Sequence, residues 1–309
     1  YLYCSWYNMK TEIVNREEKK KYTEKSPISA TVLYKTLLGG VVLAFATRKT
    51  VSKASSIYMN SKASTKRIDK FNALVVYMLG RRLKFIKKNN INMSDYPKRE
   101  YLSFNDFFTR KIKAGKRPFS KKAEDLNAIA DSKLLVYPVN EKTEMLIKGK
   151  KYTLKDLLRD KKLAQEYKGG TCLVFRLTVD DYHRYSFVDD GILIRSKKIN
   201  GILHTVGPVA FKRYKVFKEN QREYSVLNTK NFGDVIQMEI GALMVGKIVN
   251  HDIKKFKRGD EKGYFLFGGS TVVLLLKKDV VEIDSDIVLN SKLGIETKVK
   301  LGEVIGRRK

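Results

Sequence analysis

Ser270 directly follows two glycines inside a stretch that is otherwise apolar, from residue 264 to residue 276. Glycine weakens the interior of a strand and usually marks a bulge or a close approach of two backbones. The segment is therefore a local bulge or tight bend, or else it is reactive. In the reactive case the Ser270 hydroxyl attacks the carbonyl of Gly269, where the missing Cβ leaves room for the approach. A reactive serine requires a base elsewhere in the chain.

The candidate bases are few, because the chain has only three histidines, His183, His204 and His251. His183 lies in the sequence DDYHRY (residues 180–185), directly after an apolar stretch. A histidine between acids and aromatic residues is either a catalytic base or a structural residue. Asp131 precedes another apolar stretch, and it is either an orienting carboxylate or a turn residue that bonds the local backbone.

The elements that would position these residues form an α+β domain over residues 101–309. Short β-rich stretches separated by turn residues predict a mainly antiparallel sheet, with strands within residues 133–140, 171–179, 191–206, 234–249 and 264–283. Thr153 and Asp156 have the spacing of a capping box, which predicts one helix from there to about Tyr167.

The first 100 residues are expected to form a helical, basic region. Apolar positions between lysines and arginines at 71–88 follow a helical period, which suits packing on a core or contact with an anionic membrane. The apolar stretch at 36–47 is too short to cross a bilayer, which takes about 20 residues. No cleavable signal peptide is expected, and the natural start is either Tyr1 or Met9.

The charge of the chain favours anionic partners. Lysine and arginine number 63 against 33 acidic residues, a net charge of +30, which suits nucleic acid, acidic lipid, or simply a solvated surface. No zinc-finger spacing or RNA-recognition signature supports nucleic-acid binding. The two cysteines, Cys4 and Cys172, cannot form a disulfide framework or a four-thiolate zinc site, so a reducing compartment is expected.

Six segments of the chain, taken together, resemble the phosphatidylserine decarboxylase proenzymes. The resemblance covers nearly all residues from about 101 onward, and residues 9–100 share it only loosely. In the order and spacing of that family, the segments are SFNDFFTRKIKAGKRP (103–118), IADSKLL (129–135), KGKKYTLKDLL (148–158), DDYHRY (180–185), NFGDVIQMEIGALMVGKI (231–248) and EKGYFLFGGSTVVLLL (261–276).

The resemblance implies that Ser270 cleaves its own chain after Gly269. The products would be a long chain of residues 1–269 and a short chain of residues 270–309 that begins with a pyruvoyl group formed from Ser270. Asp131 and His183 match the family's acidic and histidine positions, so Asp131 would orient the imidazole and His183 would act as the base. The chain itself would supply the cofactor, and no metal site or separate cofactor-binding site is expected.

The resemblance also implies the turnover reaction. The pyruvoyl ketone would form a Schiff base with the amine of phosphatidylserine, carbon dioxide would leave, and phosphatidylethanolamine would be released, with His183 as proton donor. The enzyme would lie peripherally on the anionic, cytoplasmic side of the cell membrane, and a homo-oligomer stays open. The alternatives are a pyruvoyl-dependent decarboxylase of a soluble amino acid, a basic nucleic-acid-binding protein, and a lipid-binding relative that does not cleave itself.

One position departs from the family. Many members read D-Y-H-R-x-H and use the second histidine for cleavage and the first for decarboxylation, but this chain has Ser186 at the second position. Either His183 serves both steps or another group, such as His204, replaces the missing imidazole.

Overall fold

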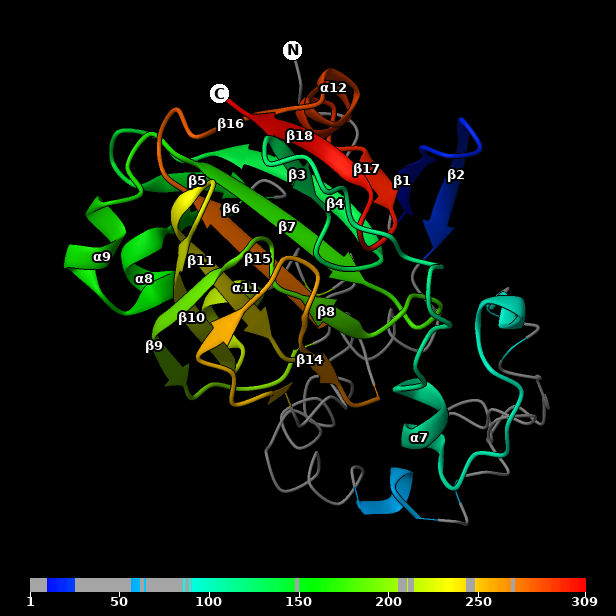
Figure 1. The fold of residues 1–309 in the computed structure, drawn as a ribbon. Helices are drawn as coiled ribbons and strands as arrows, with labels where there is room; N and C mark the ends of the chain where they lie inside the picture. Colours follow the sequence, from blue (N-terminus) through cyan, green and yellow to red (C-terminus); the bar gives the residue numbers. More distant parts are fainter. Residues whose placement is uncertain are drawn as a thin grey trace.

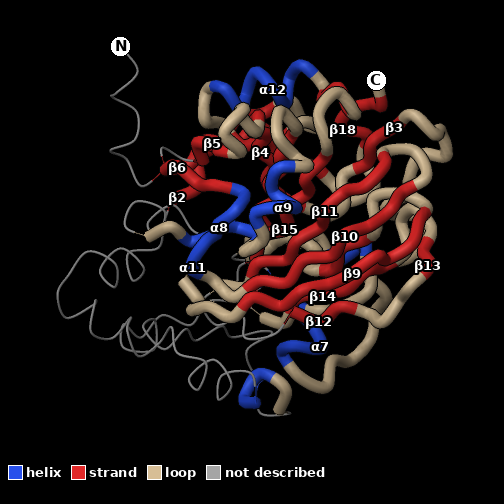
Figure 2. Tube along the Cα trace, turned by 90° about the vertical axis from the view of Figure 1, so that its left-hand side faces the viewer, coloured by secondary structure: helices blue, strands red, loops and turns tan. Residues whose placement is uncertain are grey.

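The computed structural model shows a broad β-sheet with smaller sheets and helices packed on it (Figures 1 and 2). The structure describes residues 10–25, 57–61, 64, 86, 89, 91–147, 150–204, 210, 214–242, 248–267 and 270–309. The expected α+β class, with a mainly antiparallel sheet, is confirmed.

The large sheet is antiparallel at every pairing except that of β1 with β17. Its strands, in the order in which they lie side by side, are β13 (Lys255–Phe256), β9 (Gly191–Ile199), β10 (Arg222–Thr229), β11 (Gly233–Ile240), β15 (Ser270–Leu276), β7 (Thr171–Leu177), β4 (Ser132–Pro138), β17 (Glu296–Val299), β1 (Lys10–Asn15) and β2 (Lys20–Lys25).

Three smaller sheets accompany it. The first contains β12 (Ile248–Asn250), β14 (Glu261–Phe265) and β8 (Arg184–Ser186). The second contains β16 (Val281–Ile283), β18 (Val304–Arg308) and β3 (Asp125–Asn127), and the third is the hairpin of β5 (Glu144–Ile147) and β6 (Lys150–Thr153). The described helices are η2 (Met93–Asp95), α7 (Phe104–Phe108), α8 (Leu154–Leu158), α9 (Lys161–Gln165), α11 (Val216–Glu219) and α12 (Ser285–Lys292).

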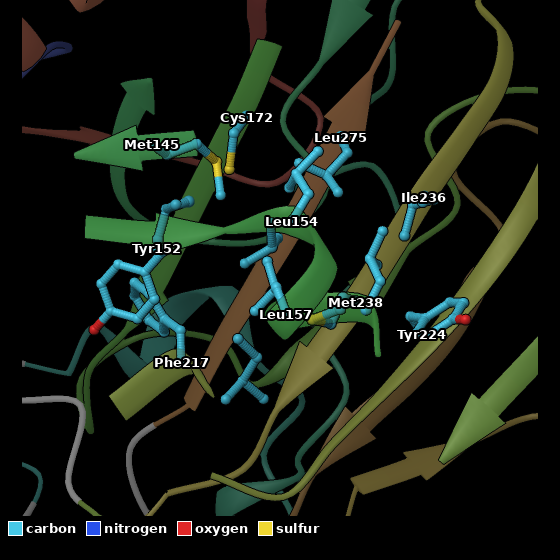
Figure 3. Packing of buried hydrophobic residues seen from close by; sticks show 14 of the residues in the cluster. Met145, Tyr152, Leu154, Leu157, Cys172, Phe217, Tyr224, Ile236, Met238 and Leu275 are labelled. Atoms are coloured by element: carbon cyan, nitrogen blue, oxygen red, sulfur yellow. The ribbon is translucent and has the colours of Figure 1, made fainter. Parts of the chain in front are cut away.

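Strand β15, which begins at Ser270, is buried on both faces. Val273 and Leu275 belong to the core cluster that α8, β5 and β6 cover, part of which Figure 3 shows. Val272 and Leu274 belong to the cluster on the other face, which residues of β3, β16 and β18 help to close. A strand that is covered on both sides reads as a continuous apolar run instead of an alternating one, which explains the five consecutive apolar residues after Thr271.

The expected helix at 153–167 is wrong in its length, because it divides into α8 and α9. Its start is confirmed, since the Thr153 hydroxyl accepts a hydrogen bond from the Asp156 N–H at 3.1 Å. Arg159 then adopts a left-handed conformation with φ of 47°, which ends α8. The Asp160 carboxylate caps α9 by accepting from Leu163 N–H at 3.0 Å.

Several expected strands are shorter than the apolar patterns that predicted them. The stretch 264–283 contains the end of β14 and all of β15 and β16, and 234–249 contains parts of β11 and β12. In the stretch 191–206, β9 ends at Ile199. Apolar residues at turns continue to pack on the core, so hydrophobicity alone does not mark where a strand ends.

The expectation of helices through residues 1–100 is wrong for residues 10–25, which form the β1–β2 hairpin at one edge of the large sheet. Arg176 of β7 binds both Glu24 of β2 and Glu296 of β17, which ties the hairpin to the sheet. The helical pattern at 71–88 lies almost wholly outside the described residues. No helix in the described ranges has the length and apolarity to cross a membrane.

Candidate active site

Ser270 is the first residue of β15, and it pairs with Leu177, the last residue of β7. The side chain is fully buried, and within the described part of the chain its Oγ has no hydrogen-bond partner. A buried hydroxyl without a partner loses its bonds to water with no compensation. Such an atom is therefore a candidate for chemistry. Gly268 and Gly269, on which the choice between bulge and reactive segment depends, lie outside the described residues.

His183 follows β7 by a short turn, and its backbone carbonyl accepts a hydrogen bond from Phe265 N–H at 3.0 Å. Phe265 is the last residue of β14, the strand that leads toward Ser270. His183 is thus connected both to β14, which precedes Ser270 in the sequence, and to β7, which pairs with the strand that Ser270 begins. Its side chain is fully buried.

The hydrogen bonds of the His183 ring define its tautomer. Nδ1 lies 3.0 Å from the carbonyl oxygen of Asp181, and a carbonyl only accepts, so Nδ1 carries the proton. Nε2 then has a free lone pair, and it has no hydrogen-bond partner among the described residues. Burial lowers the pKa of His183 to about 3, and the nearby Arg110 charge also lowers it. The imidazole is therefore neutral near pH 7, and its Nε2 lone pair is not blocked by a proton.

Helix α7 packs its aromatic residues against both parts of this site. The Phe108 ring lies 4.0 Å, centroid to centroid, from the His183 ring and 5.3 Å from the Phe267 ring. The Asn105 side chain accepts from Phe267 N–H at 2.8 Å. The helix is capped by Ser103, whose hydroxyl accepts a hydrogen bond from Asp106 N–H. One short helix thus fixes the histidine and the chain just before the candidate cleavage site.

The structure places Asp131 away from the hydrogen bonds of His183. Its carboxylate receives two hydrogen bonds from Arg117, at 2.9 and 2.7 Å, and one from Leu301 N–H at 2.7 Å. Asp131 was expected to orient the imidazole, but among the described residues the hydrogen bond of His183 Nδ1 is accepted by the Asp181 carbonyl. The carboxylate therefore fixes the start of β4 relative to two other segments.

A buried cluster around Lys133 supports the turn that carries His183, and the sequence reasoning missed it. Lys133 Nζ contacts both Asp181 carboxylate oxygens, at 2.7 and 2.9 Å, and also Asp180 and Thr178. Burial alone lowers the pKa of Lys133, but the carboxylates of Asp181 and Asp180 raise it above its ordinary value. The only available signal was the basic residue inside the apolar stretch KLLVYPV.

Ser186 lies in β8, and His204 lies in the segment that follows β9. Ser186 pairs with Glu261 between β8 and β14 and lines a cavity of about 220 Å³. His204 stacks on Tyr214 with centroids 3.9 Å apart. Its backbone bonds the Asn220 side chain, which also donates to the carbonyl of Gly241 next to the end of β11.

The third histidine has a separate environment. His251 is partly exposed, and its Nε2 lies 2.7 Å from Glu261, which also pairs with Arg184. It is therefore a surface residue of the β12–β14–β8 sheet region, with an acidic partner of its own.

Comparison with known proteins places this site in a family. The family model for phosphatidylserine decarboxylase matches residues 104–307. A phosphatidylserine decarboxylase proenzyme 2 from Clostridium acetobutylicum is 54% identical over 301 residues, which cover 96% of this chain and 99% of the relative. A phosphatidylserine decarboxylase proenzyme from Clostridium botulinum is 40% identical over 98% of this chain and 99% of its own length. One from Clostridium tetani is 44% identical over 72% of this chain and 77% of its own length. The chain therefore belongs to the phosphatidylserine decarboxylase family, and it is a decarboxylase.

Proposed function

We propose that the chain is a self-processing proenzyme that decarboxylates phosphatidylserine to phosphatidylethanolamine. The family membership supports the reaction class. The observation that carries the site is the pair of buried atoms without a hydrogen-bond partner in the described structure, Ser270 Oγ and His183 Nε2. Both residues lie at the same end of the β7–β15 pair, one as nucleophile and one as neutral base.

The proposed cleavage begins when Ser270 Oγ attacks the Gly269 carbonyl carbon. The amide C–N bond breaks, the freed nitrogen takes the hydroxyl proton, and an ester links the two residues. A base then removes the Ser270 Cα proton, and the Cβ–Oγ bond breaks to release the Gly269 carboxylate. The dehydroalanine left on residue 270 tautomerises to an imine, and water replaces its nitrogen, which leaves as ammonia. The product is a pyruvoyl group on the short chain.

The site fits such a group, because the group would form in place from a fully buried side chain to which the described residues make no hydrogen bond. Its ketone supplies a carbonyl that condenses with the substrate amine and accepts the electron pair released with carbon dioxide. His183 holds its ring by the Nδ1–Asp181 contact and presents Nε2, which takes a proton in maturation and returns one during turnover. Phe108 covers the ring and excludes water from it.

The roles of the remaining residues follow from their contacts. We assign Asp131, with Arg117, the task of holding the segment between Ile129 and β4, since Ile129 also accepts a hydrogen bond from Ser186 N–H at 3.0 Å. Because Ser186 replaces the second family histidine, His183 is the base we assign to both steps. The basic chain would bind peripherally to the anionic, cytoplasmic face of the cell membrane, and it would take its lipid substrate from there.

Intact-mass analysis combined with a vesicle assay tests this proposal. Purified protein should contain two chains divided between residues 269 and 270, and the short chain should lack an amino terminus. It should release carbon dioxide from phosphatidylserine in vesicles and little from free serine. Preference for free serine would support the soluble amino-acid alternative. Salt-sensitive DNA binding without lipid turnover would support the nucleic-acid alternative.

A further inference from the structure

Arg110 is a buried cation that has few partners in the described structure. It follows α7 by two residues and is 2% exposed. Its Nη1 donates to the Phe107 carbonyl at 3.1 Å, while Nε and Nη2 have no hydrogen-bond partner in the described ranges. A buried guanidinium with two idle nitrogens is costly, because each has lost its bonds to water.

Aromatic rings enclose this guanidinium without neutralising it. Its carbon lies 4.2 Å from the centroid of the Tyr96 ring and 4.6 Å from that of Phe107. Burial raises the pKa of Tyr96, and the charge and contact of Arg110 offset only part of that rise, so the phenol stays protonated and supplies no negative charge. Cation–π contacts compensate only part of the cost of burying a charge. The site therefore needs an anion.

The carboxylates in this part of the described structure already have other cations. The pairs are Asp131 with Arg117 at 2.7 Å, Asp181 with Lys133 at 2.7 Å, Asp106 with Arg99 at 2.6 Å, and Glu261 with Arg184 at 2.7 Å. Among the described residues Arg110 forms no ion pair. A negative charge that neutralises Arg110 must therefore come from a group other than these carboxylates.

The position of Arg110 connects it to the reaction. Phe108, two residues earlier, contacts the His183 ring, and the Arg110 charge acts on that ring. Tyr96, whose ring Arg110 covers, also lines a cavity of about 570 Å³ together with Asp131 and Asp181. Arg110 thus lies behind Tyr96 of the cavity wall, without lining the cavity itself, and is linked to His183 through Phe108.

We propose that Arg110 binds the phosphodiester of the lipid substrate through its Nε–Nη2 edge. This inference rests on the proposed function. The two idle nitrogens lie on the same edge of the guanidinium, whose parallel N–H groups match two phosphate oxygens. The phosphodiester keeps its charge throughout decarboxylation. The substrate carboxylate loses its charge as carbon dioxide leaves, so a cation bound there would stabilise the ground state and slow the reaction.

The first arm of the test uses the unaltered mature protein and varies the substrate. Short-chain phosphatidylserine is compared with its methyl phosphotriester, each at low mole fraction in neutral phosphatidylcholine micelles so that surface charge is constant. Loss of the phosphate charge should lower kcat/KM by roughly 10- to 100-fold, the range expected for charge-assisted hydrogen bonds. Equal kcat/KM for the two lipids would overturn the proposal, whether or not any variant folds.

The second arm varies the protein. Arg110→Gln should lower kcat/KM per pyruvoyl group for the diester by a similar factor and leave the triester nearly unchanged. Arg110→Lys should recover part of the loss. Arg99→Gln, which removes a half-exposed arginine beside α7, is the matched control and should keep the preference for the diester.

Three results would contradict the assignment. Equal losses for diester and triester would show that Arg110 acts on the protein, for example through His183. If Arg110→Gln cleaves itself slowly but turns over normally, Arg110 binds the carboxylate released at Gly269 during maturation and does not bind the substrate phosphate. An unchanged preference for the diester in Arg110→Gln would exclude phosphate binding. A failure of the proposed function would be distinct, because unaltered protein would then lack the pyruvoyl group or leave phosphatidylserine intact.

Discussion

Ser270 and Leu177 are direct register partners, so the strand that begins with the candidate nucleophile and the strand that leads to His183 meet at one point of the sheet. The turn after Leu177 is closed by the Asp181 carboxylate, which accepts from Thr178 N–H at 2.7 Å. The Asp181 carbonyl then holds the imidazole. The sheet register and this turn together determine where the base lies relative to the serine.

Ser270→Ala should remain one uncut chain of 35.6 kDa without decarboxylase activity. The substitution removes the oxygen that attacks Gly269, and a methyl group fits the buried position. Intact mass and carbon dioxide release measure the two effects. Ser285→Ala, at the exposed start of α12, is the control and should mature normally. An active, full-length Ser270→Ala protein would refute the mechanism.

His183→Asn should lower decarboxylation per cleaved chain by at least about 100-fold, as expected when an acid–base group is lost. The asparagine amide can still donate to the Asp181 carbonyl, so the turn is preserved while Nε2 disappears. Because we assign His183 to both steps, self-cleavage should also slow. Mass spectrometry and turnover separate the two effects. His251→Asn, at the surface, should change neither; normal turnover in His183→Asn would disprove the assignment.

Acid should destabilise the fold through His183 in a predictable window. Burial lowers its pKa to about 3, against about 6.5 in the unfolded chain, so only the unfolded state binds a proton between these values. The stabilisation is complete above about pH 6.5 and falls as pH drops through this window, by roughly 3 kcal/mol at about pH 4. Urea unfolding at a series of pH values measures this loss, with the uncut Ser270→Ala protein compared with Ser270→Ala/His183→Asn. Identical slopes in both proteins would contradict the buried neutral imidazole.

The sequence offers Ser270 and His183 as candidates because their signals are local: two glycines in an apolar stretch, and a histidine just after one. Their proposed roles come from the resemblance of six segments to the decarboxylase family. The partners of Asp131 could not be found in this way, since Arg117 and Leu301 reach it from distant parts of the chain. The β1–β2 hairpin could not be predicted from the sequence for a similar reason. Its polar strands are stabilised by Arg176 and by pairing with β17, neither of which leaves a pattern in residues 10–25.

Asp131→Asn should slow maturation, because the amide binds Arg117 less tightly and frees the segment before β4. Arg117→Gln should have a similar effect, and the double variant should be little worse than either single one, since both remove the same ion pair. The appearance of the short chain over time measures the rate. Strictly additive losses would show that Asp131 acts on a group other than Arg117, and unchanged kinetics in all three variants would remove it from maturation.

Lys133→Met should be strongly destabilising even though methionine suits an apolar strand. The substitution leaves the Asp181 carboxylate buried without its cation, and breaking one side of a buried ion pair costs about 3–5 kcal/mol. Urea unfolding measures the loss, with Lys155→Met on the exposed side of α8 as the control.

Lys133→Met/Asp181→Leu should recover much of the stability, because no buried charge then remains unpaired at that contact. It should not recover turnover, since the leucine cannot accept from Thr178 N–H, and the turn whose carbonyl orients His183 loses its closing bond. Full activity in that stable double variant would show that the Asp181 carboxylate has no part in placing the base.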